Sequence, residues 1–307
     1  MAQKKGKFPR QDPQGSAPDS ARWEAARAGG ADRFDRIDAL RGLALVWMAV
    51  FHFCFDLATY GLIDANFYQD PLWTWQRTCI LSTFLLCAGA GQAVATARGQ
   101  SWSRFGRRWA QVVGCAVLVS LGSWWMFPRS YISFGVLHGM AVMLVVARLS
   151  APLKGWLWPL GLLAALLPLA VQDPFFDTRW TNWVGLVTHK PVTEDHVPVL
   201  PWLGVMWWGM AATQWLMANR PQWLTSACAP GGASAARRKD TEIAQSTQGA
   251  SGDNTAPRAQ PGRGPGPVWR SLTVLGTWSL TFYMVHQPVL IGGLMAWLRW
   301  RGHAGAP

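Results

Sequence analysis

His52 and Asp56 are an imidazole and a carboxylate four residues apart inside a long apolar stretch, Arg36 to Tyr60. In a helix they share one face, and Arg41 falls close to that face about three turns earlier. Ionisable side chains at membrane depth are costly and are therefore functional candidates. A carboxylate beside an imidazole can fix its tautomer and raise its basicity, which suits a general base. The alternative is a histidine that only forms a hydrogen bond between two helices.

Two further histidines lie in apolar segments. His138 is expected in the middle of a span that contains FGVLHGMA, where a tight helix contact explains it as well as a functional role does. His286 belongs to YMVHQP, and a proline bends a helix and frees a carbonyl one turn earlier. A kinked polar segment usually lines a cavity, so we expect Tyr283, His286 and Gln287 to line one.

Three histidines on three spans are also compatible with a haem or metal site, because helix bundles take such ligands from facing helices. No two of these histidines share a span at ligand spacing, so no metal is expected. The five cysteines form no CxxC pair and are interpreted as small apolar core residues. Two more histidines, His189 and His196, fall in a polar segment that is interpreted as a solvated loop.

The elements that must position these groups are membrane helices. Charged residues make up only 14% of the chain, 21 residues are Trp, and the apolar residues come in long blocks. A helix needs about 20 apolar residues to cross a bilayer. The blocks predict an all-α, polytopic membrane bundle of about seven transmembrane helices, the first with Asp38 as its N-cap. The expected spans are Ala39–Tyr60, Leu72–Ala97, Trp109–Phe127, Tyr131–Leu149, Gly155–Val171, Pro198–Met217 and Ser271–Leu298.

The distribution of positive charge predicts the orientation. The net charge is +12, and the basic residues gather in the N-terminal tail, in a loop at Arg98 to Arg108, at Arg148 to Lys154, and at Arg220 to Arg263. All four segments fall on one side of a seven-span bundle, so that side and the N-terminus are expected to be cytoplasmic. No folded basic domain remains to bind nucleic acid.

The composition also divides the chain. Residues 1–33 are expected to be a disordered basic tail and 219–269 a flexible linker rich in Pro, Gly and Ala. Residues 34–218 would hold spans one to six, and 270–307 the last span and the C-terminal tail.

Four motifs together resemble a known family. They are RIDALRGLALVWMAVFHFCFDL, FGVLHGMA, PWLGV and YMVHQPVL. The chain is similar to bacterial membrane proteins of the family named for the catalytic domain of heparan-alpha-glucosaminide N-acetyltransferase, formerly a domain of unknown function. This family falls within the class of transmembrane acyltransferases.

The resemblance implies an enzyme of the bacterial inner membrane that transfers an acetyl group from cytoplasmic acetyl-CoA to a hydroxyl or amine. The acceptor would be a periplasmic or envelope glycan, or another small molecule. Arg36 and Arg41 would then bind the CoA phosphates, His52 would be the general base and Asp56 would orient it. His138 and His286 would line the same cavity. A different class remains open, namely a transporter or flippase whose histidines relay protons.

Overall fold

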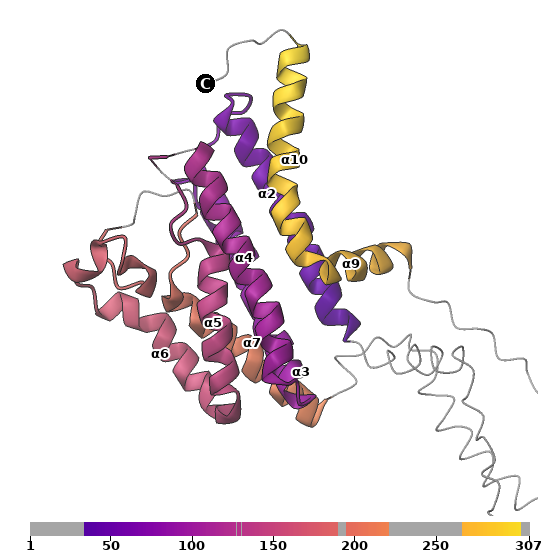
Figure 1. The fold of residues 1–307 in the computed structure, drawn as a ribbon, viewed down its shortest axis with the longest axis vertical. Coiled ribbons are helices and arrows are strands. Elements are labelled where there is room, and N and C mark those ends of the chain that lie inside the picture. Colours follow the sequence, from indigo (N-terminus) through magenta and orange to yellow (C-terminus); the bar gives the residue numbers. More distant parts are fainter. Residues whose placement is uncertain (1–33, 127, 130, 190–194, 221–265, 302–307) are drawn as a thin grey trace, which may run out of the picture. The chain divides into compact units, whose positions relative to one another are not determined.

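The computed structural model describes residues 34–126, 128–129, 131–189, 195–220 and 266–301 (Figure 1). These residues form helices and no strand, which confirms the all-α prediction. The tail at 1–33 and most of the linker, 221–265, lie outside the described residues. The α-helices are α2 (Asp35–Thr59), α3 (Pro71–Ala97), α4 (Trp102–Met126), α5 (Val136–Ser150), α6 (Leu157–Ala170), α7 (Val199–Asn219), α9 (Pro267–Thr277) and α10 (Ser279–Trp300).

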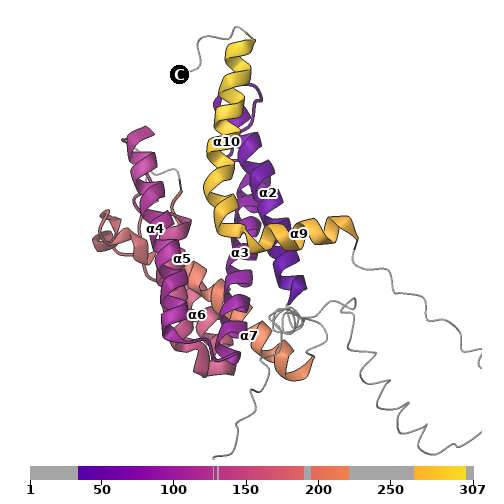
Figure 2. The same cartoon turned by 45° about the vertical axis from the view of Figure 1, so that its right-hand side comes forward.

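Each of the seven expected spans contains a helix, and the helices alternate in direction. In Figure 1, α2, α4, α6 and α10 run upward, whereas α3, α5 and α7 run downward. We call the end at which α2 begins and α7 ends the basal end, and the opposite end the distal end. In both Figure 1 and Figure 2, α9 crosses the lower part of α2 at a steep angle, well above the lower ends of α3 and α7.

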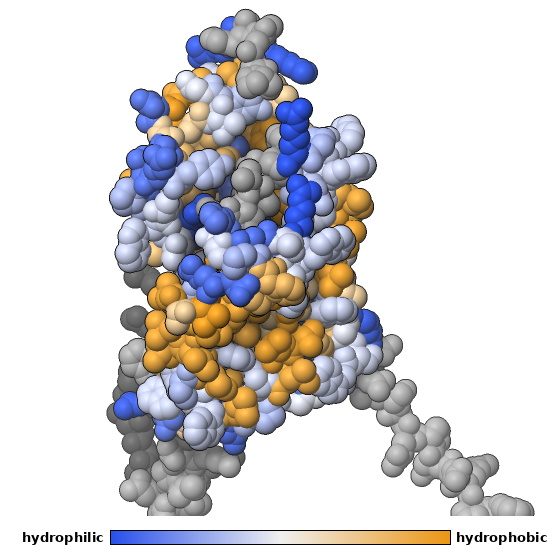
Figure 3. Space-filling view, turned by 90° about the vertical axis from the view of Figure 1, so that its left-hand side faces the viewer, coloured by the Kyte–Doolittle hydropathy of each residue, from blue (hydrophilic) through white to orange (hydrophobic). Residues whose placement is uncertain are grey.

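The surface of the bundle is that of a membrane protein. Within the described residues, four helical segments are long and apolar enough to cross a bilayer, including α5 and α6 taken together as Val136–Ala170. Large apolar side chains point outward, among them Leu121 on α4 and Leu163 on α6. Figure 3 shows one face, where hydrophobic residues form a continuous area with hydrophilic residues above and below it. Such an outward apolar surface is stable only in lipid.

Four helix boundaries differ from the prediction. The first helix begins with Phe34 as its N-cap, so Asp38 lies inside α2 and pairs with Arg41 instead of capping. The helix α4 begins at Trp102, seven residues early, which places its arginines in the first two turns and not in a loop. Arginine is a good helix former, and the Ser101 hydroxyl accepts the Arg104 N–H at 3.4 Å.

The other two differences affect site residues. The helix α5 begins only at Val136, so His138 lies in its first turn and not in the middle of a span. The last expected span is two helices, because the chain leaves helical geometry at Trp278. The longer of the two helices is α10, which begins at Ser279.

Glycines set the closest helix contacts. A Cβ on Gly89 of α3 would lie 2.0 Å from the Met206 carbonyl oxygen of α7, and one on Gly42 of α2 would lie 2.0 Å from that of Leu272 in α9. Small residues let backbones approach closely, and such packing holds helices together in lipid. The resulting interior has two apolar clusters. One joins α3, α5 and α7 around Met206, and the other joins α2 and α3 around Phe51.

Candidate functional site

The imidazoles of His52 and His286 face each other between α2 and α10. Their ring centroids are 5.3 Å apart, although the two residues are more than two hundred positions apart in the sequence. The two helices run in the same direction, so the pair lies at corresponding depths on both (Figure 1). The structure thus brings together two of the three histidines that the sequence placed in spans.

Hydrogen bonding fixes the tautomer of His286. Its Nδ1 lies 2.7 Å from the Tyr283 carbonyl oxygen, which can only accept, so Nδ1 carries the hydrogen. In the neutral ring Nε2 is then an acceptor. The Nε2 atom is buried and has no partner among the described residues. The ring of Phe282 stacks on His286 at 5.7 Å with an interplanar angle of 8°, which holds this orientation.

Asp56 is buried in the same interface, with only 4% of its surface exposed. Its Oδ1 accepts a hydrogen bond of 3.0 Å from the Gln287 amide of α10. No hydrogen bond joins Asp56 to His52 in the described structure. The carboxylate expected to orient His52 is bonded to Gln287 instead.

Three buried acceptor atoms in this interface have no donor among the described residues. They are Asp56 Oδ2, Gln287 Oε1 and His286 Nε2. Buried polar atoms are nearly always hydrogen-bonded, so a group of unpaired acceptors needs an explanation. A molecule that carries O–H or N–H groups would supply the missing donors. We refer to His52, Asp56, His286 and Gln287 as the α2–α10 site.

Tyr283 belongs to this region through packing. Its ring centroid lies 5.8 Å from that of His286, and the side chain packs against the apolar cluster around Phe51. Of the residues expected to line one cavity, Tyr283, His286 and Gln287 therefore come together beside His52.

His138 lies apart from this group and is part of a local hydrogen-bond chain. The Gly135 N–H donates to its Nδ1 at 3.2 Å, so Nε2 carries the hydrogen and faces the Ser120 hydroxyl, also at 3.2 Å. That hydroxyl donates in turn to the Ile132 carbonyl at 2.6 Å. These directions leave no lone pair on His138 that would activate Ser120. The arrangement ties the start of α5 to α4.

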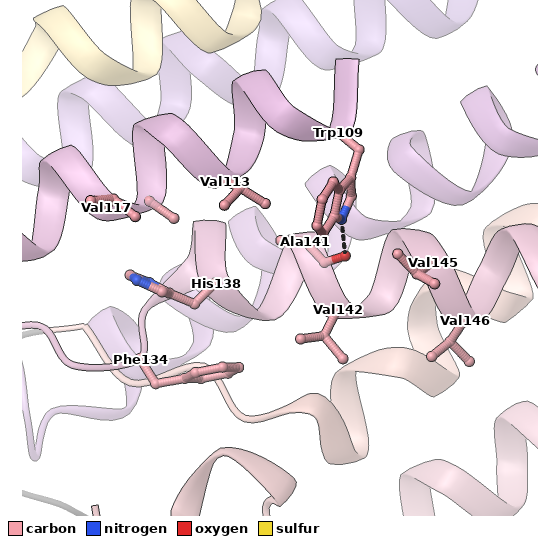
Figure 4. A pocket seen from close by; sticks show the side chains of 10 residues that line it. Trp109, Val113, Val117, Phe134, His138, Ala141, Val142, Val145 and Val146 are labelled. Carbon is pink, nitrogen blue, oxygen red and sulfur yellow. Dashed lines mark hydrogen bonds between the residues drawn. The ribbon is translucent and has the colours of Figure 1, made fainter. Parts of the chain in front are cut away.

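A groove of about 460 Å³ runs between α4 and α5 beside His138 (Figure 4). Its lining is apolar except for His138 and Trp109, whose indole N–H donates to the Ala141 carbonyl at 2.9 Å. None of the α2–α10 residues lines this groove.

Arg41 lies at the basal end, about 16 Å below His52 along α2. Its guanidinium contacts three helices: it donates to Asp38 Oδ1 at 3.0 Å, to the Gly276 carbonyl at 3.4 Å and to the Cys87 carbonyl at 3.5 Å. Arg41 therefore stabilises a helix junction, whatever else it binds. Arg36 is exposed one turn earlier on α2.

The interpretation as a solvated loop is wrong for His196 and for its neighbour Asp195. Asp195 Oδ2 accepts the Val136 N–H at 3.2 Å, and both ring nitrogens of His196 are buried. Burial raises the pKa of Asp195, while the Val136 N–H and the charge of Arg77 oppose this shift. Asp195 turns inward because α5 begins at Val136, and the first N–H groups of a helix need an acceptor. The one feature of the sequence that could have indicated this role of Asp195 is its position directly before an apolar span.

His189, in the same loop, is at the surface, where its side chain is 89% exposed. It lies 2.7 Å from the Thr188 hydroxyl, which itself donates to Asp177. This hydrogen bond holds the pKa of Asp177 below its ordinary value.

The sequence model of the family described as heparan-alpha-glucosaminide N-acetyltransferase, catalytic, matches residues 33–236. The chain belongs to this family. The match includes His52 and Asp56, whereas α10 with His286 and Gln287 lies beyond it. No curated protein and no solved structure matches the chain. Family membership and the apolar helices together support a membrane protein with acetyltransferase activity in general terms.

No metal site is visible in the part of the chain that the structure describes. No group of three or more His, Cys, Asp or Glu residues there is arranged to hold a metal ion.

Proposed function

We propose that the chain is a membrane-embedded acyltransferase that moves an acetyl group from acetyl-CoA to a hydroxyl or amine of a sugar. The α2–α10 site is the observation that supports this. It combines an imidazole pair with three buried acceptor atoms that lack donors, inside a chain of an acetyltransferase family. An acceptor sugar carries the O–H and N–H groups that Asp56 Oδ2 and Gln287 Oε1 can bind.

His52 is the proposed general base. A ring nitrogen of His52 takes the proton of the acceptor O–H or N–H as the acceptor atom attacks the thioester carbonyl. The carbon–sulfur bond then breaks, and the CoA thiolate leaves and takes up the proton from the imidazolium. Neither the donor nor the acceptor has to form a covalent bond to the protein.

His286 takes the orienting role that the sequence suggested for Asp56. Its ring lies 5.3 Å from that of His52 and its Nε2 is an acceptor, so this atom can receive the second ring N–H of His52 once the rings turn. Catalytic hydrogen bonds of this kind often shorten only when substrate binds. Asp56 supports the same site by placing negative charge near the imidazolium as it forms.

The basal end is proposed to face the cytoplasm of a bacterium, across its inner membrane. The basic segments at Arg98 to Arg108 and at Arg148 to Lys154 lie at this end, as do Arg36 and Arg41. Arginines bind phosphate well, so these two side chains would hold the CoA phosphates. The glycan acceptor would enter from the distal end.

The test is acetyl transfer by the purified protein in liposomes. Labelled acetyl-CoA and a panel of amino sugars and neutral sugars are supplied, and the products are identified by mass spectrometry. His52→Ala is expected to lower kcat by about 10²- to 10⁴-fold, the usual contribution of a general base. His189→Ala is the matched control, because it removes an exposed histidine that is not part of the α2–α10 site.

Full activity of His52→Ala would remove His52 from the mechanism. Movement of a sugar across the liposome membrane with no acetylated product would instead support the transporter alternative and overturn the proposal.

A further inference from the structure

The helix α9 differs from the spans in direction and in its two faces. It begins with Pro267 after Gly266 and crosses α2 within the first two turns of that helix, which are the lower part of α2 in Figures 1 and 2. The start of α2 is where a spanning helix leaves the hydrocarbon core. A short helix that lies across the spans at this depth is placed in the membrane interface.

One face of α9 is fixed to the bundle. A Cβ on Gly42 would lie 2.0 Å from the Leu272 carbonyl oxygen, and one on Gly276 would lie 1.9 Å from that of Asp38. Arg41 donates to the Gly276 carbonyl, an unpaired acceptor in the last turn of α9. These contacts account for one side of the helix and for its position.

The other face is an exposed stripe of one cation and two apolar side chains. Arg270, Val274 and Trp278 follow one another at four-residue spacing, and the exposed fractions of Val274 and Trp278 are 58% and 65%. With Ser271 and Leu275 they line a hollow of about 430 Å³. No carboxylate among the described residues forms an ion pair with Arg270.

This arrangement has the chemistry of a phospholipid at the membrane surface. A guanidinium and a hydroxyl bind a phosphate, while valine and tryptophan cover the glycerol and the upper acyl chain. We propose that this face of α9 binds an anionic phospholipid of the basal leaflet. The bound lipid would also hold the start of α10, because α10 begins one residue after Trp278 ends the α9 turn. The proposal does not depend on the acyltransferase mechanism.

The experiment measures lipid binding to the full chain in detergent, by native mass spectrometry and by the rise in Tm. The probes are phosphatidylglycerol, phosphatidylcholine and inorganic phosphate. Phosphatidylglycerol is expected to bind more tightly than phosphatidylcholine and to raise Tm further. Arg270→Gln is expected to weaken phosphatidylglycerol binding about fivefold, the effect of one basic residue near an anionic surface. Ser271→Ala is a milder second variant with the same direction of change.

Arg299→Gln is the matched control, since it removes an exposed arginine from the last turn of α10 at the distal end. Equal binding of the two lipids, or unchanged phosphatidylglycerol binding in both Arg270→Gln and Ser271→Ala, would overturn the proposal. So would a rise in Tm with inorganic phosphate as large as that with the lipid, because it would indicate a simple anion site.

Discussion

Gly276→Ala tests whether the crossing of α2 and α9 positions the imidazole pair. The added Cβ would lie 1.9 Å from the Asp38 carbonyl oxygen, whereas such contacts are essentially never shorter than 3.0 Å. The helices must therefore separate by at least 1.1 Å at this point. The contact is with backbone, so no side chain can rotate away to relieve it.

The size of the effect follows from two opposing contributions. Overpacking of this kind lowers the free energy of unfolding by about 1–3 kcal/mol. Replacing glycine by alanine in a helix raises it by up to about 1 kcal/mol. Because the clash is with a carbonyl oxygen, we expect a net loss of about 1–2 kcal/mol. The shift passes into α10 through Thr277 and Trp278, so His286 moves away from His52. A misplacement of about 1 Å can lower a catalytic rate by about 10²-fold.

The assay compares Tm and the rate of acetyl transfer in Gly276→Ala, Gly42→Ala and Gly292→Ala. Gly42 makes the second close contact in the same crossing, so its variant is expected to lose stability and activity as well. Gly292, on α10, has nothing within 4 Å of its added Cβ among the described residues, and its variant is expected to gain about 0.5–1 kcal/mol. A Tm and a rate at or above the wild-type values in Gly276→Ala would refute the reasoning.

Three further predictions concern the hydrogen-bonded groups outside the α2–α10 site. His138→Ala breaks the chain from Gly135 to Ser120 and is expected to lower stability by about 1–2 kcal/mol, with an unchanged kcat at saturating substrate; a large fall in kcat would show a catalytic role. The raised pKa of Asp195 means that its protonated form stabilises the fold below the ordinary pKa of 3.8, and this contribution is lost as the pH rises through the folded pKa. Asp195→Asn is therefore expected to raise Tm at neutral pH and to flatten its pH dependence, and a lower Tm at pH 7 would contradict this. Asp177 has a lowered pKa, so its contribution is present above 3.8 and is lost as the pH falls through the folded pKa. Asp177→Asn should lower Tm at neutral pH but not in strong acid, and equal Tm values at pH 7 would show that the hydrogen bonds from Thr188 contribute nothing to stability.

The sequence predicted the helical spans well, because each depends on a local run of apolar residues. It also identified His52, Asp56, Tyr283, His286 and Gln287 as polar groups inside such runs. Helical spacing placed His52 and Asp56 on one face of α2, and the α2–α10 site contains both. These features depend on residues within a few turns of one another.

Two of the boundaries that differ, the start of α5 and the break between α9 and α10, depend on contacts between distant residues. Asp195 accepts the Val136 N–H across 59 positions, and Arg41 reaches the Gly276 carbonyl across 235. No local sequence pattern predicts that α5 begins as late as Val136 or that the last expected span is divided into α9 and α10. In each case a backbone group at a helix end finds its partner on another part of the chain.

The sequence alone determined that this is a helical membrane protein and which of its polar side chains lie within long apolar runs, because an apolar run of sufficient length can enter lipid whatever its neighbours are. Only the tertiary structure decided that His52 pairs with His286 while His138 bonds to Ser120 and Gly135. An apolar helix can pack against any other helix in lipid, so the choice of neighbours is made by close backbone contacts at glycines such as Gly42 and Gly276. Those contacts bring α9 and α10 against α2, and with them the second half of the site.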